Sequence, residues 1–149
     1  MKTAADIMTR KVITVTAASS VKDLARILTE NNISGVPVVN EDGMLIGVVT
    51  ESDLIDQNKR IHIPTVVSIL DSFIYLESPD RMEKEIQKIA GSTVADIYTS
   101  DPITVTVTTP LDELATIMSE KSIHTLPVLE DGKLVGVIGK KDIIRTIIS

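Results

Sequence analysis

The stretch GVVTESDL at residues 47–54 recurs as GVIGKKDI at residues 136–143. In both copies a run of apolar, mostly β-branched residues leads into an apolar helix that carries an aspartate, Asp53 or Asp142. A chain of 149 residues has room for one compact domain or two small ones. Two related units fit this length, so an internal repeat is the first feature to establish.

The similarity extends upstream over most of each copy. ADIMTRKVITVT at residues 5–16 aligns with ADIYTSDPITVT at residues 95–106. Other aligned pairs are Leu24 with Leu114, Ile33 with Ile123, Pro37 with Pro127, Gly43 with Gly132 and Gly47 with Gly136. A match over roughly fifty residues is not expected by chance and indicates two copies of one supersecondary unit.

Each copy has the pattern of a strand, a helix, a β-hairpin and a second helix. We expect Ser19 and Thr109 to be the N-caps of the first helices, with Pro110 at the first helical position. The predicted strands are 12–16, 36–39 and 45–50 in the first copy and 103–107, 126–129 and 134–138 in the second. The predicted fold class is α/β (α+β in some schemes), with two β-α-β-β-α repeats.

Three segments divide the chain: repeat one at 1–60, an insert with a linker helix at 61–93, and repeat two at 94–149. The insert begins with an unusually apolar stretch, 61–76, which we interpret as a packing or contact surface. A linker helix is predicted to begin near Ser78.

The last helix carries a wide apolar stripe formed by Ile143, Ile144, Ile147 and Ile148. Two interpretations remain open. Either a second protomer covers the stripe in a homodimer, or the stripe packs inside the monomer.

Composition excludes several classes of function. The net charge of −6 disfavours binding to a phosphate backbone, and aromatic residues make up only 2% of the chain, so we expect no direct contact with nucleic acid. Without cysteine there is no disulfide or thiolate metal site. Neither a signal sequence nor a membrane span is recognisable, and the cytoplasm is the expected location.

The two repeats together resemble a tandem pair of cystathionine β-synthase domains, the Bateman module. The resemblance is carried by the Pro-Val strands, the acidic-Gly turns and the two helix starts at 47–54 and 136–143. It covers everything except the insert. It implies two sheets related by a pseudo-twofold axis, with clefts between the copies that bind AMP, ADP, ATP or S-adenosylmethionine, and flat dimers of modules.

Thr50 and Asp53 are the first candidates for ligand binding. A helix start offers free N–H groups to phosphate, and a carboxylate one turn into the helix can accept both ribose hydroxyls. The alternative is a capping box, which needs no ligand. The second copy keeps Asp142 but has Gly139 at the cap position. Because a pure cap would more naturally lose both residues, this favours a role for the aspartate beyond the cap.

The resemblance implies that the opposite repeat completes each cleft. Around Asp53 these residues are Thr99, Thr104 and Ile123 for adenine, and His124 and Lys141 for phosphate, together with Thr50 of the first repeat. The similarity is greatest to the γ subunit of AMP-activated kinase, where a matching His and Lys contact phosphate. The alternative is that His124 and Lys141 are ordinary solvated side chains.

The second cleft has Asp142 for ribose, with Thr9, Thr14, Ile33 and Ser34 around adenine. The positions that correspond to His124 and Lys141 are the neutral Ser34 and Ser52. We therefore expect phosphorylated ligands to prefer the Asp53 cleft.

No catalytic motif is recognisable, because the two histidines lie in different segments and no P-loop or GxGxxG is present. The expected function is that of a non-catalytic regulatory module. It senses AMP, ADP or ATP, with Mg²⁺ as a companion of the phosphates, and signals to an unidentified effector protein. Alternatives are a ligand-free scaffold, an S-adenosylmethionine sensor, or a regulatory piece of a DNA-bound or nucleotide-metabolising complex.

Overall fold

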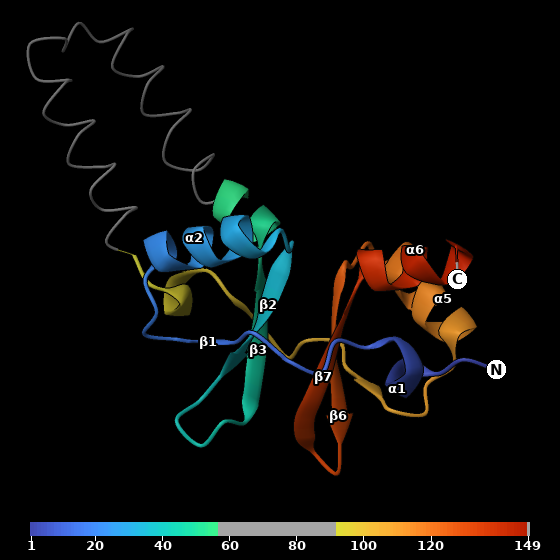
Figure 1. The fold of residues 1–149 in the computed structure, drawn as a ribbon. Helices are drawn as coiled ribbons and strands as arrows, with labels where there is room; N and C mark the ends of the chain where they lie inside the picture. Colours follow the sequence, from blue (N-terminus) through green and yellow to red (C-terminus); the bar gives the residue numbers. More distant parts are fainter. Residues whose placement is uncertain (57–91, 149) are drawn as a thin grey trace, which may run out of the picture.

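The computed structural model describes residues 1–56 and 92–148. The predicted insert 61–76 and the linker helix near Ser78 lie outside the described residues. Figure 1 shows two similar halves side by side, each with its own sheet and helices. The strand orders are β1-β2-β3-β4 and β5-β6-β7. The predicted two-repeat α/β fold is confirmed.

The first half contains β1 (Val15–Thr16), α2 (Val21–Asn31), β2 (Gly35–Val39), β3 (Leu45–Thr50) and a helix described over residues 51–56. The second half contains β5 (Val105–Thr106), α5 (Leu111–Lys121), β6 (Thr125–Glu130), β7 (Lys133–Gly139) and α6 (Lys140–Ile148). Short segments open each repeat ahead of these elements: α1 (Ala4–Ile7) in the first, and η2 (Val94–Asp96) with β4 (Thr99–Ser100) in the second. In each half the first strand is parallel to the second, which forms an antiparallel hairpin with the third.

The opening segment of each repeat packs on the half formed mainly by the other repeat. Figure 1 shows α1 beside the second half, and the yellow segment that holds η2 beside β1 and α2. Thr9 and Val137 exchange two backbone hydrogen bonds of 2.9 and 3.0 Å. Thr99 pairs with Val48 at the equivalent position of the first half. The third strand of each half therefore pairs with residues from the opening segment of the other repeat. This pairing holds the two halves together.

The repeated glycines of the two helix-start motifs allow this close approach. A Cβ atom at Gly136 would collide with the side chain of Met8. A Cβ atom at Gly47 would collide with the ring of Tyr98 and the carbonyl oxygen of Thr99. Any larger residue would push the crossing segment away from the sheet.

Each half has its own apolar core, and the crossing segments contribute to both. Val94 packs with the first core, while Ala4 and Met8 pack with the second. The fully buried residues with the largest side chains include Leu24 in the first core, and Leu114 and Ile138 in the second. Because apolar burial provides most of the stabilisation, loss of a crossing segment would weaken the half on which it packs.

The predicted N-caps Ser19 and Thr109 are wrong by one position, because the helices begin after Ser20 and Pro110. Pro110 is accordingly the cap residue and not the first helical residue. Ser19 Oγ instead accepts the backbone N–H of Thr16 at 3.1 Å, and Thr109 makes the equivalent bond. These hydroxyls close the turn between strand and helix.

The first strand of each repeat is shorter than predicted. Residues 12–16 and 103–107 were the expected ranges, whereas β1 and β5 have two residues each. The chain before these strands is crossing from the opposite half, so only the last residues can pair with β2 or β6. The apolar pattern reflects burial along the crossing as well as strand pairing.

Part of the apolar stripe on α6 lies on the surface. Ile143 packs against the second core, while Ile144, Ile147 and Ile148 are exposed. Packing among the described residues therefore does not cover this stripe. Within residues 1–56 and 92–148 no helix is both long and apolar enough to cross a bilayer.

Candidate functional site

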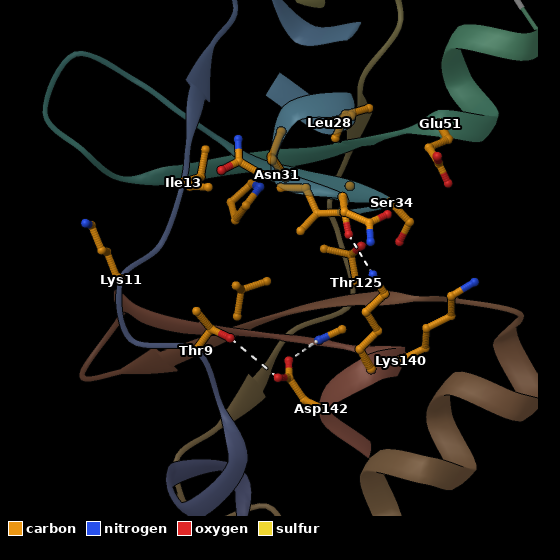
Figure 2. A pocket seen from close by; sticks show the side chains of 18 of the residues that line it. Thr9, Lys11, Ile13, Leu28, Asn31, Ser34, Glu51, Thr125, Lys140 and Asp142 are labelled. Carbon is orange, nitrogen blue, oxygen red and sulfur yellow. Dashed lines mark hydrogen bonds between the residues drawn. The ribbon is translucent and has the colours of Figure 1, made fainter. Parts of the chain in front are cut away.

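A cavity of about 560 Å³ lies between the two halves, on the side of Asp142 (Figure 2). The first repeat lines it with the entrance to β1, the end of α2 and the start of β2. The second repeat contributes the end of β7 and the start of α6. Its volume falls in the range of roughly 300–1,000 Å³ that is typical of small-molecule sites.

Asp142 is the best-anchored charged group of the cavity, with a side chain only 7% exposed. Its Oδ2 accepts the backbone N–H of Gly139 at 2.8 Å. Its Oδ1 accepts from Arg145 Nη1 at 3.0 Å and lies 3.5 Å from Thr9 Oγ1. One carboxylate oxygen thus caps the helix while the other faces side chains of the cavity, as Figure 2 shows for Thr9.

The charged side chains that line the cavity are mostly cationic: Lys11, Lys140, Lys141 and Arg145, against the two carboxylates of Glu51 and Asp142. This is an excess of positive charge in a chain whose net charge is −6. The start of α6 adds the positive end of a helix dipole. The electrostatics of the cavity therefore favour a ligand that carries negative charge.

The apolar part of the lining comes mainly from the first repeat: Ile13, Leu28, Ile33, Val36 and Pro37, together with Val137 of the second. Figure 2 shows Lys11 and Ile13 at the end of the cavity opposite Lys140. Apolar side chains around Ile13 and Ile33, with cations gathered at the start of α6, suit a ligand with a flat ring at one end and an anionic group at the other.

β2 faces β6 where the two halves meet. A Cβ atom on Gly35 would lie 2.6 Å from Oγ1 of Thr125, a buried polar residue. These two residues occupy equivalent positions of the two repeats. Only the absence of a side chain at Gly35 permits this contact, which sets the separation of the walls.

Asp53 occupies the matching helix start but is held by a complete cap. Its Oδ2 accepts from the backbone N–H of Thr50 at 2.9 Å and from Thr50 Oγ1 at 3.2 Å. The cap bonds expected of this pair are therefore present, and its role in ligand binding stays a prediction. The argument that a pure cap would lose both residues is wrong, because Asp142 still accepts the N–H of Gly139 without any hydroxyl.

The residues predicted for the second cleft are largely brought together. Thr9, Ile33, Ser34 and Asp142 all line the cavity, while Thr14 is exposed and outside its lining. The ligand-binding roles of these residues stay predictions.

Lys141 lies elsewhere than expected. Its Nζ donates to the carbonyl oxygen of Asn32 at 3.0 Å, within the lining of the Asp142 cavity. It precedes Asp142 directly at the start of α6, so both side chains leave the same helix end. The residues predicted to close the Asp53 cleft are less enclosed: Thr99, Thr104 and His124 are exposed, and Ile123 packs against the second core.

Sequence reasoning missed Lys11, Lys140 and Arg145 as lining residues. A signal for them exists in the repeat itself. The corresponding positions of the other copy are Asp101, Glu51 and Asp56, so the charge is reversed at all three. Among the described residues, no group of three or more His, Cys, Asp or Glu side chains is arranged to hold a metal ion.

The CBS domain model matches residues 4–67 and 94–149. The chloroplastic CBS domain-containing protein CBSX2 of Arabidopsis thaliana is 30% identical over 154 residues. That match covers 96% of this chain but 62% of the relative, so the chain spans about three fifths of its length.

Solved structures agree in fold. The crystal structure of CBSX2 in complex with AMP is similar with a TM-score of 0.73 at 27% identity, covering 99% of this chain and 97% of that one. The CBS domain pair of protein MJ0100, in complex with 5′-methylthioadenosine and S-adenosyl-L-methionine, gives a TM-score of 0.70 at 26% identity, covering 99% and 96%. This chain is a member of the CBS domain family and carries two copies of the domain.

Proposed function

We propose that the chain is a non-catalytic regulatory module that binds an adenine nucleotide in the cavity of Asp142. The observation that carries the proposal is the buried carboxylate of Asp142 within a cavity of about 560 Å³ whose charged lining is mainly cationic. The complex of CBSX2 with AMP supports the same class of ligand.

The lining has a group for each part of such a ligand. Asp142 Oδ1 and Thr9 Oγ1 provide an acceptor and a donor for the ribose hydroxyls. The apolar wall around Ile13 and Ile33 suits the adenine ring. Lys140 and Lys141, at the start of α6, suit the phosphate.

This assignment reverses the expected order of the two clefts. The expectation favoured Asp53 because His124 and Lys141 were placed there, and Lys141 instead lines the Asp142 cavity. The set formed by Asp53, Thr50 and His124 remains a second, weaker candidate, because the positions equivalent to Lys11, Lys140 and Arg145 are acidic in the other copy.

Signalling requires a partner, and the exposed face of α6 is where we propose contact. Ile144, Ile147 and Ile148 present an apolar surface that a second protomer or an effector protein would bury. The free energy available for signalling is bounded by the difference in ligand affinity between two arrangements of the halves.

S-adenosylmethionine is the main alternative ligand, favoured by the complex of MJ0100.

Thermal unfolding with AMP, ADP, ATP, S-adenosylmethionine and no ligand separates the alternatives. A ligand at 100 times its dissociation constant adds about 2.7 kcal/mol to the free energy of unfolding. We expect a shift with AMP that exceeds the shift with S-adenosylmethionine. No shift with any adenine compound would contradict the proposal and favour a scaffold. ADP and ATP, each with and without Mg²⁺, show how many phosphates the site accepts.

A further inference from the structure

Two ion pairs in this chain have the same spacing along a helix but different surroundings. Arg26 pairs with Asp23 at 3.3 Å, and both side chains are more than half exposed. Arg145 pairs with Asp142 at 3.0 Å, where the arginine is 68% exposed and the aspartate 7%. The first is an ordinary surface pair of small energetic value. The second joins a largely exposed cation to the buried carboxylate of the cavity.

Resting on the proposed function, we propose that Arg145 is a specificity-determining residue, which yields Asp142 to the ribose and then pairs with an anionic group of the ligand. The site would thereby select anionic adenine nucleotides over uncharged or cationic adenosyl compounds. Three donors contact Asp142, and they differ in how easily each can move away.

Of the three donors to Asp142, Arg145 has the long, exposed side chain that a ligand can displace. Gly139 donates from the backbone at the start of α6. Thr9 is held by its two backbone hydrogen bonds with Val137, of 2.9 and 3.0 Å. The arginine side chain is largely in solvent and hangs on a long, flexible stem. A ribose diol that approaches Oδ1 therefore displaces the guanidinium.

The displaced guanidinium stays at the cavity, because Arg145 is part of its lining. A phosphate offers it a new partner, and guanidinium–phosphate bonds are charge-assisted and often bidentate. Adenosine offers no such partner, so its binding loses one ion pair without replacement. The cost of breaking the Arg145–Asp142 pair thus becomes a penalty specific to ligands without negative charge.

The test measures the affinities of AMP and adenosine, which differ only in the phosphate, by titration calorimetry on the full chain. For Arg145→Met we expect the preference for AMP over adenosine to fall about tenfold. Adenosine should bind this variant at least as tightly as the wild type, since it no longer competes with the arginine. Arg145→Lys keeps the charge and should retain most of the preference.

Arg26→Met is the matched control, because it removes an arginine at the same spacing from an aspartate outside the cavity. Its preference should equal that of the wild type. Equal changes in both affinities for Arg145→Met, or a similar loss of preference in Arg26→Met, would overturn the role of Arg145 alone. Failure of the wild type to bind either compound would overturn the proposed function and this inference with it.

Discussion

The two repeats differ in how they begin their last helix. In the first repeat Thr50 donates twice to one oxygen of Asp53, from its backbone and from its hydroxyl. In the second repeat Gly139 has only its backbone N–H to donate, and the other oxygen of Asp142 faces the cavity. The loss of a single hydroxyl leaves one more acceptor position on Oδ2 of Asp142 than on Oδ2 of Asp53, while Oδ1 of Asp142 accepts from Arg145.

Two further helix starts support this comparison. Asp6 accepts from the backbone N–H and the hydroxyl of Thr3, and Asp96 accepts both bonds from Thr93. The hydrogen bond from the Thr3 backbone lowers the pKa of the Asp6 carboxyl below its ordinary value. A Thr three residues before an Asp is thus a recurrent helix-start device of this chain, and Asp142 is the described case without the hydroxyl.

The charges of the two repeats also differ, and the difference again favours a ligand at Asp142. The positions Lys11, Lys140, Lys141 and Arg145 correspond to Asp101, Glu51, Ser52 and Asp56. Four cationic side chains of the Asp142 cavity thus match acidic or neutral residues in the other copy, of which Glu51 also lines this cavity. An anionic ligand gains attraction at Asp142 that the equivalent positions around Asp53 do not supply.

The largest expected effect comes from making the repeats alike where they touch. Gly35→Thr places a side chain against Thr125 Oγ1, 2.6 Å from the new Cβ. We expect a loss of about 1–3 kcal/mol in the free energy of unfolding, as for other overpacked sites. In the exchange variant with Thr125→Gly we expect part of this loss to be recovered. Urea unfolding of the single and double variants measures the coupling. Simple additivity would contradict the proposed contact.

A smaller effect is expected from restoring the missing hydroxyl. A Cβ at Gly139 would lie 3.7 Å from the His124 carbonyl oxygen and 3.9 Å from Asp142 Oδ2, which is ordinary contact. Gly139→Thr should therefore fold and gain up to about 1 kcal/mol of stability. Its hydroxyl would occupy the open acceptor position of Asp142 Oδ2, as Thr50 does at Asp53, which would leave a ribose diol only Oδ1. We therefore expect AMP to bind about fivefold more weakly. Thr50→Gly, which opens the other cap, serves as the control. AMP affinity equal to the wild type in Gly139→Thr would contradict the comparison.

The fold could be predicted because both copies carry the same pattern of strand, helix and hairpin residues. A hairpin such as that of β2 and β3 is a local feature, with turn residues between apolar strands. The crossing of α1 and η2 to opposite halves could not be predicted, because it depends on long-range pairing such as that of Thr9 with Val137. The shortened strands β1 and β5 have the same cause.

The aspartate of the candidate site could be predicted from the sequence, but the positive charge of the cavity lining was not. Asp142 follows from the motif and its repeat, and Thr9 and Ser34 follow from the family resemblance. The position of the Lys141 side chain depends on where Asn32 ends α2, which the sequence alone does not reveal. Arg145 is one helical turn after Asp142, so its pairing was accessible from i,i+3 spacing.

The most direct test of the account is a calorimetric titration of AMP into the wild type, Asp142→Asn and Asp53→Asn. Because hydrogen bonds to a charged group are worth about 1.5–3 kcal/mol, we expect Asp142→Asn to weaken AMP binding at least about tenfold. Asp53→Asn should leave the affinity near that of the wild type. Loss of AMP binding in Asp53→Asn, with Asp142→Asn unaffected, would contradict the assignment of the ligand to the Asp142 cavity.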